Sequence, residues 1–260
     1  MSNNIRNITI IAHVDHGKTT MIDNLMKQSG SFRENEVVDE RLMDSGELEK
    51  ERGITILAKP ASIDWQGSRI NIIDTPGLDD FIVEIASTMR VADSVVTVIN
   101  AQHGVEIGTE IIWDYVDRFS RPTLFVINQI YSPNADFDES FKSIVELVGN
   151  NAIKIQYPLV VDGAQCIVDV LKMKMYKFGP EGGKPEKLEI PADQIDIANE
   201  LHNELVEKAA ENDEALMELY FDKGTLNEDE MRLGIQVASH RQYDLSRFRL
   251  TKARALADYR

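Results

Sequence analysis

A short segment near the N-terminus carries the residue types that proteins use to hold phosphate. Residues 12–19 read AHVDHGKT, which is the spacing of a P-loop with alanine in place of its first glycine. A nearly all-apolar, strand-like run precedes the segment at Ile8–Ala12, and apolar residues at helical spacing follow it in Thr19–Gln28. In that context the backbone N–H groups of Asp15 to Thr19 would lie at the N-terminus of a helix, where anions bind. A chance Gly-Lys-Thr turn is the alternative, and the flanking patterns disfavour it.

The side chains of this segment have the chemistry of a nucleotide-phosphate site. Gly17 would allow the backbone to approach a phosphate closely, and Lys18 would reach the β- and γ-phosphate oxygens. The hydroxyl of Thr19 would bind Mg²⁺. The segment therefore predicts binding of a nucleoside triphosphate together with a divalent cation.

Two later segments fit the same chemistry. Asp74 ends a second strand-like run and begins Asp-Thr-Pro-Gly, where its carboxylate could contact Mg²⁺ through water. The N–H of Gly77 could meet the γ-phosphate, and Thr55, in Glu-Arg-Gly-Ile-Thr, could give Mg²⁺ a second hydroxyl when that phosphate is present. Each segment is weak evidence alone, but their order and spacing together indicate a phosphate-hydrolysing site with a switch segment.

The elements around these segments predict the fold class. Strand-like and helix-like patterns alternate through residues 1–151, which is typical of an α/β fold with a mostly parallel sheet and helices on both faces. Together with the P-loop spacing, this predicts the P-loop NTPase fold class. A helix is expected within Val105–Phe119, and strands are expected at Ile8–Ala12, Ile54–Ile63, Arg69–Asp74, Ser94–Asn100 and Thr123–Asn128. Ligands of such sheets bind at the carboxyl ends of the strands, where the P-loop and Asp74 are expected.

The pattern changes after about residue 151, and residues 152–240 are expected to form an inserted α+β subdomain. Strands are predicted at Ala152–Val161 and Gln165–Phe178, and helices at Asp193–Glu211, at Glu214–Phe221 and from about Asn227. The first of these helices would bury one apolar stripe, formed by Ile195, Ala198, Leu201 and Leu205. Residues 241–260 are interpreted as a degenerate tail near the expected last strand of the first domain.

The overall composition limits the remaining classes of function. The 260-residue chain has a net charge of −16, which disfavours broad binding to nucleic-acid backbones and gives no indication of specific DNA binding. Its single cysteine, Cys166, excludes a disulfide framework within the chain and a cysteine-based zinc cluster. No apolar run approaches the length of a membrane span, and the N-terminus has no leader pattern. The composition predicts a soluble, cytoplasmic protein without membrane contact and leaves the oligomeric state unknown.

The motifs resemble those of the translational GTPases. HVDHGKTT, MDSGELEKERGIT and NIIDTPG are similar to the first three motifs of that family. The segments that begin QYPLVVDG and EIPADQID follow the pattern of the subdomain inserted in elongation factor G, and the resemblance extends from Ile5 to Ala238. It implies a P-loop domain that binds GTP or GDP with Mg²⁺ and hydrolyses GTP to GDP and phosphate in association with the ribosome.

The resemblance also implies roles for individual residues. Mg²⁺ would be held by Thr19 and Thr55, and by Asp74 through water. Lys18, Thr55 and Gly77 would support hydrolysis. The expected nucleotide-binding residues are Asp15, His16, Gly17, Lys18, Thr19, Thr20, Asn128, Gln129 and Tyr131.

Hydrolysis is the first step at which the sequence departs from the family pattern. Leu78 follows Asp-Thr-Pro-Gly at the position where the family has a histidine that orients the attacking water. Leucine has no donor or acceptor, and a positioned polar group of this kind is typically worth ~10²–10⁴-fold in rate. Asp79 or Asp80 could stand in, but a carboxylate beside a γ-phosphate is a poor substitute. Val14 and Ile54 match the apolar positions beside this water, and slow or absent hydrolysis is expected.

The base-reading loop is the second departure. The family has Asn-Lys-x-Asp, whose aspartate accepts two hydrogen bonds from guanine, whereas this chain has Asn-Gln-Ile-Tyr from Asn128 to Tyr131. A tyrosine cannot be a two-oxygen acceptor, and sites built on such polar pairing discriminate by ~10⁴–10⁵. Weaker GTP binding and relaxed base choice are expected. Tyr131 could stack on a purine, or the loop has lost its role.

The end of the chain is the third departure. The family has a last strand, a Ser-Ala-x loop and a last helix after the inserted subdomain, and the register places Thr251 near that loop. The preceding Arg-Phe-Arg-Leu is a poor buried strand, and nine residues follow Thr251. The last helix and the later domains of elongation factor G are therefore not expected here.

Two hypotheses for the function follow. The first is a translation-factor-type GTPase domain with impaired activity, and the second is a catalytically inactive, shortened relative or fragment that acts only as a nucleotide- or partner-binding module. An ATPase is a distant third, because no adenine-specific feature is visible.

Three large aromatic residues are expected in the core rather than at a ligand: Trp65, Trp113 and Phe125.

Overall fold

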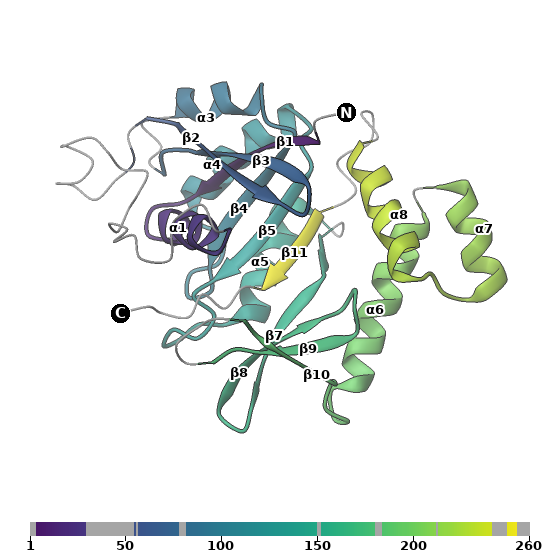
Figure 1. The fold of residues 1–260 in the computed structure, drawn as a ribbon. Helices are drawn as coiled ribbons and strands as arrows, with labels where there is room; N and C mark the ends of the chain where they lie inside the picture. Colours follow the sequence, from purple (N-terminus) through teal and green to yellow (C-terminus); the bar gives the residue numbers. More distant parts are fainter. Residues whose placement is uncertain are drawn as a thin grey trace. The chain divides into compact units, whose positions relative to one another are not determined.

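The structure is a computed structural model of the chain. It describes residues 4–29, 55, 57–77, 82–149, 152–179, 184–211, 213–240 and 249–253. The chain divides into two compact units, one formed by residues 1–100 with 105–123 and the other by residues 101–104 with 124–260. Figure 1 shows the helices and strands that make up each unit.

Four strands of the first unit have the order β2-β3-β1-β4. β1 is parallel to both β3 and β4, whereas β2 is antiparallel to β3. The strands span Ile5–Ala12 (β1), Lys59–Trp65 (β2), Ser68–Asp74 (β3) and Ser94–Asn100 (β4). Because β1 and β3 are parallel, with Ile10 opposite Asp74, their carboxyl ends lie next to each other.

Three helices cover these strands. In Figure 1, α1 (Lys18–Gln28) lies on one side of the strands, and α3 (Ile82–Met89) and α4 (Ile107–Arg118) lie on the other. The hydroxyl of Thr9 in β1 donates to the hydroxyl of Thr88 in α3 across 3.1 Å. Apolar side chains from strands and helices fill the space between them and are almost fully buried, among them Ile10, Ile22, Ile72, Ile85 and Met89.

The second unit contains two groups of strands. β5, β11 and β6 follow one another in that order, and β11 runs parallel to β6 with Leu250 opposite Ile153. Helix α5 (Phe137–Val148) separates β5 from β6 in the chain. The three strands span Thr123–Asn128 (β5), Ala152–Lys154 (β6) and Arg249–Ala253 (β11). The structure thus forms a strand next to β6 where the sequence indicates a poor one.

A four-stranded sheet and three helices make up the rest of the second unit. The sheet has the order β10-β9-β8-β7, and its three pairings are antiparallel. Its strands span Gln156–Val161 (β7), Ala164–Asp169 (β8), Lys174–Lys177 (β9) and Glu186–Leu188 (β10). The helices span Ile195–Ala210 (α6), Glu214–Lys223 (α7) and Glu228–His240 (α8).

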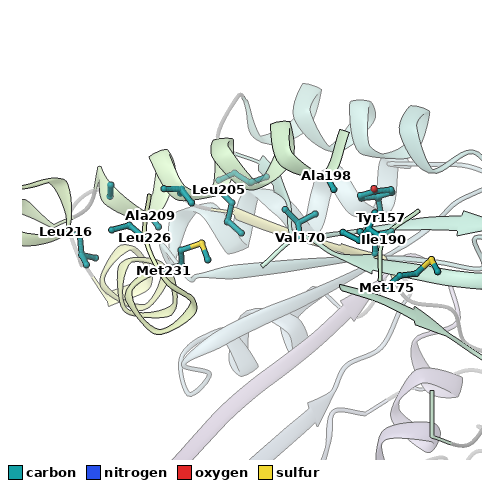
Figure 2. Close-up of a cluster of buried hydrophobic side chains, with 14 of the residues drawn as sticks. Tyr157, Val170, Met175, Ile190, Ala198, Leu205, Ala209, Leu216, Leu226 and Met231 are labelled. Carbon is teal, nitrogen blue, oxygen red and sulfur yellow. The ribbon is translucent and has the colours of Figure 1, made fainter. Parts of the chain in front are cut away.

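One hydrophobic cluster joins this sheet to its helices, and Figure 2 shows its side chains. Val170 and Met175 come from the sheet side, and Ala198 and Leu205 come from α6. Leu216 and Met231, from α7 and α8, extend the cluster along α6. The predicted α+β character of this part of the chain is confirmed, as is the P-loop fold class of the first part. The predicted boundaries at residues 151 and 240 stay predictions.

Several predicted elements are corrected by the structure. The run Ala152–Val161 is not one strand, because the chain leaves β6 at Ile155, whose carbonyl accepts the N–H of Val170 at 3.0 Å. The run Gln165–Phe178 is a hairpin rather than one strand, since residues 170–173 turn between β8 and β9. The strand predicted from Ile54 begins at Lys59 instead.

Two expectations about burial are wrong as well. Trp65 is 53% exposed at the end of β2, beside the two-residue turn, whereas Trp113 and Phe125 are buried as predicted. Ile195 is 43% exposed because it is the first residue of α6, outside the stripe formed by Ala198 and Leu205.

Candidate functional site

The loop between β1 and α1 has the backbone geometry of an anion cradle. Asp15 and Gly17 have φ angles of 62° and 84°, both in the left-handed region. Glycine takes this conformation without strain, whereas Asp15 is one of the few non-glycine residues with a left-handed φ among the residues that the structure describes. Turns of this kind direct successive N–H groups toward one point, which forms a concavity for an anion.

The N-terminus of α1 directly follows the left-handed residue Gly17. The helix starts at Lys18, and its N-cap residue, Gly17, has no side chain that could cap the first turn. The first turn also contains no acidic residue that would compete with an anion. Thr19 is half-buried and Thr20 is exposed in this turn. The predicted phosphate-binding residues from Asp15 to Thr20 therefore lie together, at the positive end of a helix dipole.

A buried ion pair connects this loop to the end of β3. The Lys18 ammonium contacts the Asp74 carboxylate, and the two side chains are 7% and 0% exposed. The hydroxyl of Thr75 donates to the carbonyl of Ile10 in β1 at 2.8 Å, which holds the end of β3 against β1. The structure thus brings together the predicted lysine and the predicted carboxylate.

Gly77 packs against the start of the loop. A Cβ atom at this position would lie 3.3 Å from the carbonyl oxygen of Ala12 and 3.6 Å from the nitrogen of Val14. The absence of a side chain therefore lets the segment after Asp74 approach the backbone of the cradle. Thr55 is 5% exposed. Leu78 and Ile54, which bear on the hydrolytic step, lie outside the described residues.

The donor set is compatible with Mg²⁺ bound together with phosphate. Among the residues that the structure describes, no group of three or more His, Cys, Asp or Glu side chains could form an all-protein metal site. Mg²⁺ usually keeps several waters and takes one or two carboxylates plus substrate phosphates. Asp74 at the end of β3 has one carboxylate and Thr19 in the first turn of α1 has a hydroxyl, which fits that pattern, and Thr55 stays the predicted second hydroxyl.

His16 and Glu106 form a contact that sequence reasoning did not predict. The Nε2 atom of His16 lies 2.6 Å from a carboxylate oxygen of Glu106, the residue directly before α4. The other ring nitrogen lies 3.1 Å from the carbonyl of Val98 and 3.3 Å from the nitrogen of Asn100. Burial lowers the pKa of His16 below its ordinary value, although Glu106 and Val98 oppose that shift. Ninety residues separate the two partners, so no local pattern could have indicated the contact.

The predicted base-reading loop lies in the second unit. Asn128 ends β5 and is almost fully buried, and its carbonyl accepts the N–H of Ala101 at 2.9 Å. Gln129 has a φ of 57°, and its carbonyl accepts the N–H of Ser132 at 3.0 Å, so the chain turns directly after the strand.

Tyr131 is held by the antiparallel sheet of the same unit. Its hydroxyl donates to the carbonyl of Cys166 in β8 across 2.9 Å. Burial raises the pKa of this hydroxyl above its usual value, so it stays protonated and remains a donor. The hydroxyl hydrogen of Tyr131 is therefore donated to the backbone carbonyl of Cys166, a buried strand residue.

Similarity to a solved structure supports the fold. A crystal structure of ttk003000868 from Thermus thermophilus matches 97% of this chain with a TM-score of 0.84 and 23% sequence identity. The chain spans 38% of the length of that protein, and at this identity the match speaks for the fold alone.

No helix within the described residues is both long and apolar enough to cross a membrane.

The family follows from a sequence model that covers most of the chain. Residues 3–240 match the model of the elongation factor Tu GTP-binding domain, a stretch that includes the cradle, Asp74 and the loop at Asn128. The chain therefore belongs to the family of elongation-factor-type GTP-binding domains.

Proposed function

We propose that this domain binds GTP and GDP with Mg²⁺ and hydrolyses GTP slowly, in association with the ribosome. The observation that carries the proposal is the loop from Asp15 to Lys18, with two left-handed residues, an open helix N-terminus and a buried lysine. Family membership supports guanine nucleotides as the ligand. The Mg²⁺ ion, the hydrolysis and the ribosome are the proposed extensions.

The residues of the first unit define how the phosphates would be held. The N–H groups of residues 15–20 would donate to phosphate oxygens, and Lys18 would exchange its contact with Asp74 for one with the outer phosphates. Asp74 would then contact Mg²⁺ through water, beside the hydroxyls of Thr19 and Thr55. When bound, Mg²⁺ would supply positive charge where negative charge develops during transfer of the phosphoryl group.

The proposed rate of hydrolysis is low because of Leu78. No hydrogen bond from this side chain can orient water, and a positioned group typically contributes ~10²–10⁴-fold. Lys18 and the cradle would still stabilise the transition state electrostatically. We therefore expect turnover well below that of a member of the family with histidine at this position.

A second candidate, a domain that binds nucleotide or a partner without hydrolysis, is favoured by one observation. The hydroxyl of Tyr131 donates to the carbonyl of Cys166, and its single oxygen cannot take the place of a carboxylate with two acceptor oxygens. Guanine presents neighbouring N–H donors, and only an acceptor with two oxygens satisfies both. In this candidate the phosphates are bound and the base contributes little.

The proposal is tested by titrating the purified chain with fluorescent GTP, GDP and ATP analogues, with and without Mg²⁺. Lys18→Ala serves as the variant that disables the cradle, and Lys27→Ala, in the last turn of the same helix, is its matched control. Gln129→Lys combined with Tyr131→Asp restores the family's acceptor. Release of phosphate is followed with and without ribosomes.

Each outcome separates the candidates. Mg²⁺-dependent binding that Lys18→Ala abolishes and Lys27→Ala spares would establish the cradle, and ribosome-stimulated phosphate release would establish the GTPase. Binding without release in any condition would favour the second candidate. Absence of binding by the unaltered chain and by the restored loop would refute the GTPase and the nucleotide-binding form of the second candidate, and would leave only a partner-binding module.

A further inference from the structure

Glu106 directly precedes helix α4, and its side chain does not cap that helix. Its backbone carbonyl accepts the N–H groups of Thr109 and Glu110 at 2.8 and 3.1 Å, so the residue stands at the N-cap position. Its side chain makes no capping hydrogen bond. The carboxylate instead reaches His16 at 2.6 Å, and the Glu106 side chain is 35% exposed. An N-cap side chain usually satisfies its own helix, so this orientation connects α4 to the loop that precedes α1.

The distances define which atom carries the proton. If Nε2 of His16 had no hydrogen, its lone pair would face a carboxylate oxygen at 2.6 Å, and two acceptors would repel each other. Nε2 therefore carries a hydrogen and donates it to Glu106. Nδ1 then either accepts the N–H of Asn100 in a neutral ring or donates to the carbonyl of Val98 in a charged one. The lowered pKa of His16 favours the neutral ring.

His16 is the central residue of the cradle. It stands between Asp15 and Gly17, which have the two left-handed φ angles of the loop. The side chain is 1% exposed, so its ring cannot relax into solvent. The end of β4 contacts one edge of the ring, and Glu106 contacts the other. The ring of His13 lies 5.5 Å away in an edge-on arrangement.

We infer that Glu106 is a positioning residue for the phosphate cradle, because its carboxylate accepts the Nε2–H of His16 and thereby fixes the loop whose N–H groups face the anion. Glu106 itself contacts no part of the proposed ligand in this account. The inference rests on the proposed binding of nucleotide phosphates at this loop. It assigns to α4 the function of holding the cradle in its binding conformation.

The test compares three variants by calorimetric titration with GDP and with inorganic pyrophosphate. Glu106→Ala removes the acceptor, and we expect both ligands to bind roughly tenfold more weakly, because loss of a hydrogen bond to a charged group lowers the population of the binding conformation of the loop. Glu106→Gln keeps an acceptor oxygen, and we expect it to rescue most of the affinity. Glu110→Ala removes an exposed carboxylate one turn later in α4 and should leave both affinities unchanged.

Nitrogen-15 spectra of the His16 ring provide a readout that general loss of stability does not produce. The unaltered chain and Glu106→Gln should show a protonated Nε2, and Glu106→Ala should shift the Nε2 signal together with the backbone amide signals of residues 15–19. Equal affinities for Glu106→Ala and the unaltered chain, or an unprotonated Nε2 in the unaltered chain, would overturn the inference.

The proposed function can fail separately. If the unaltered chain binds neither GDP nor pyrophosphate, nucleotide binding at the loop is refuted, and the spectra alone decide on Glu106. Unchanged amide signals of residues 15–19 in Glu106→Ala would then refute its positioning role. Changed signals would retain that role for the loop conformation.

Discussion

At the scale of single residues, the ion pair of Lys18 and Asp74 shows how charge is kept inside the first unit. Both side chains are almost completely buried, although charged groups are expensive to remove from water. Each charge is tolerated because the other compensates it. Lys18, the lysine predicted to bind phosphate, is thus also expected to affect the stability of the protein without nucleotide.

Replacing Lys18 by Met should therefore destabilise the chain. The methionine fills most of the lysine volume, but the buried carboxylate of Asp74 loses its cation, and breaking a buried pair typically costs about 3–5 kcal/mol. Urea unfolding followed by circular dichroism measures the free energy of unfolding. The double variant Lys18→Met with Asp74→Asn should recover most of the loss, and a double variant as unstable as the single one would contradict this explanation.

Tyr131 offers a second prediction at this scale. Tyr131→Phe removes only the hydroxyl that donates to Cys166, so we expect a loss of about 1 kcal/mol in the free energy of unfolding. Binding of GTP relative to ATP should not change, because the hydroxyl does not select the base. A decrease in the GTP/ATP affinity ratio in parallel titrations of Tyr131→Phe would show that this hydroxyl does contact the base.

At the scale of elements, the sequence pattern predicted strands whose own residues favour the extended conformation. The run Ser94–Asn100 is apolar and β-branched, and the structure has β4 at the same bounds. The hairpin of β8 and β9 was not predictable from glycine or proline, because its turn is formed by Val170, Leu171, Lys172 and Met173. Asp169 is a sequence signal for this turn, because its carboxylate accepts the N–H of Lys172 at 3.0 Å.

Helix α5 was not predicted, although its sequence carries the signals of a helix. Asp136 caps the helix by accepting the N–H of Glu139, and Ile144 and Val148 recur at helical spacing on its buried side. The phosphate cradle was predictable because its residues are consecutive. The contacts of His16 with Glu106 and of Tyr131 with Cys166 join distant segments, and tertiary packing alone determines them.

The packing of α8 on α6 leads to a prediction at the element scale. A Cβ atom at Gly234 would lie 2.4 Å from the backbone carbonyl oxygen of Ala209, so the two helices approach each other where a side chain is missing. Gly234→Ala should destabilise the second unit by roughly 1–3 kcal/mol, although alanine favours helix formation by about 1 kcal/mol. Chemical denaturation of both forms provides the measurement.

The neighbouring residue supplies the control for this prediction. Leu233 is 50% exposed on the same turn of α8, so Leu233→Ala should change the free energy of unfolding far less. Equal effects of the two substitutions, or stabilisation by Gly234→Ala, would show that α8 can move away from α6 without cost.

At the scale of the whole molecule, the residues predicted to bind the nucleotide lie far apart in the chain. The cradle and Asp74 belong to the first unit, and the loop at Asn128 belongs to the second. The cradle has the residue types expected from the family resemblance, whereas the loop has Tyr131 where that resemblance leads us to expect an aspartate, and Tyr131 donates a hydrogen bond to Cys166 in the sheet. Phosphate affinity and base selectivity are therefore expected to respond to different substitutions.

The acid response of the whole molecule gives the last prediction. Burial holds the pKa of His16 below its ordinary value of 6.5, which the unfolded chain retains. As pH falls below about 6.5, His16 becomes protonated in the unfolded state but stays neutral in the folded state. The free energy of unfolding therefore decreases. The decrease amounts to at most about 1.4 kcal/mol per pH unit and ends once the pH passes the lowered pKa.

Many carboxylates of this acidic chain also titrate, and a variant, His16→Gln, isolates the contribution of the imidazole. Urea unfolding of both proteins between about pH 5 and about pH 8 should give curves that are parallel above about pH 7 and diverge below, with the unaltered chain losing more stability. Curves that stay parallel throughout would mean that His16 titrates alike in both states and that its burial does not disfavour the charged ring.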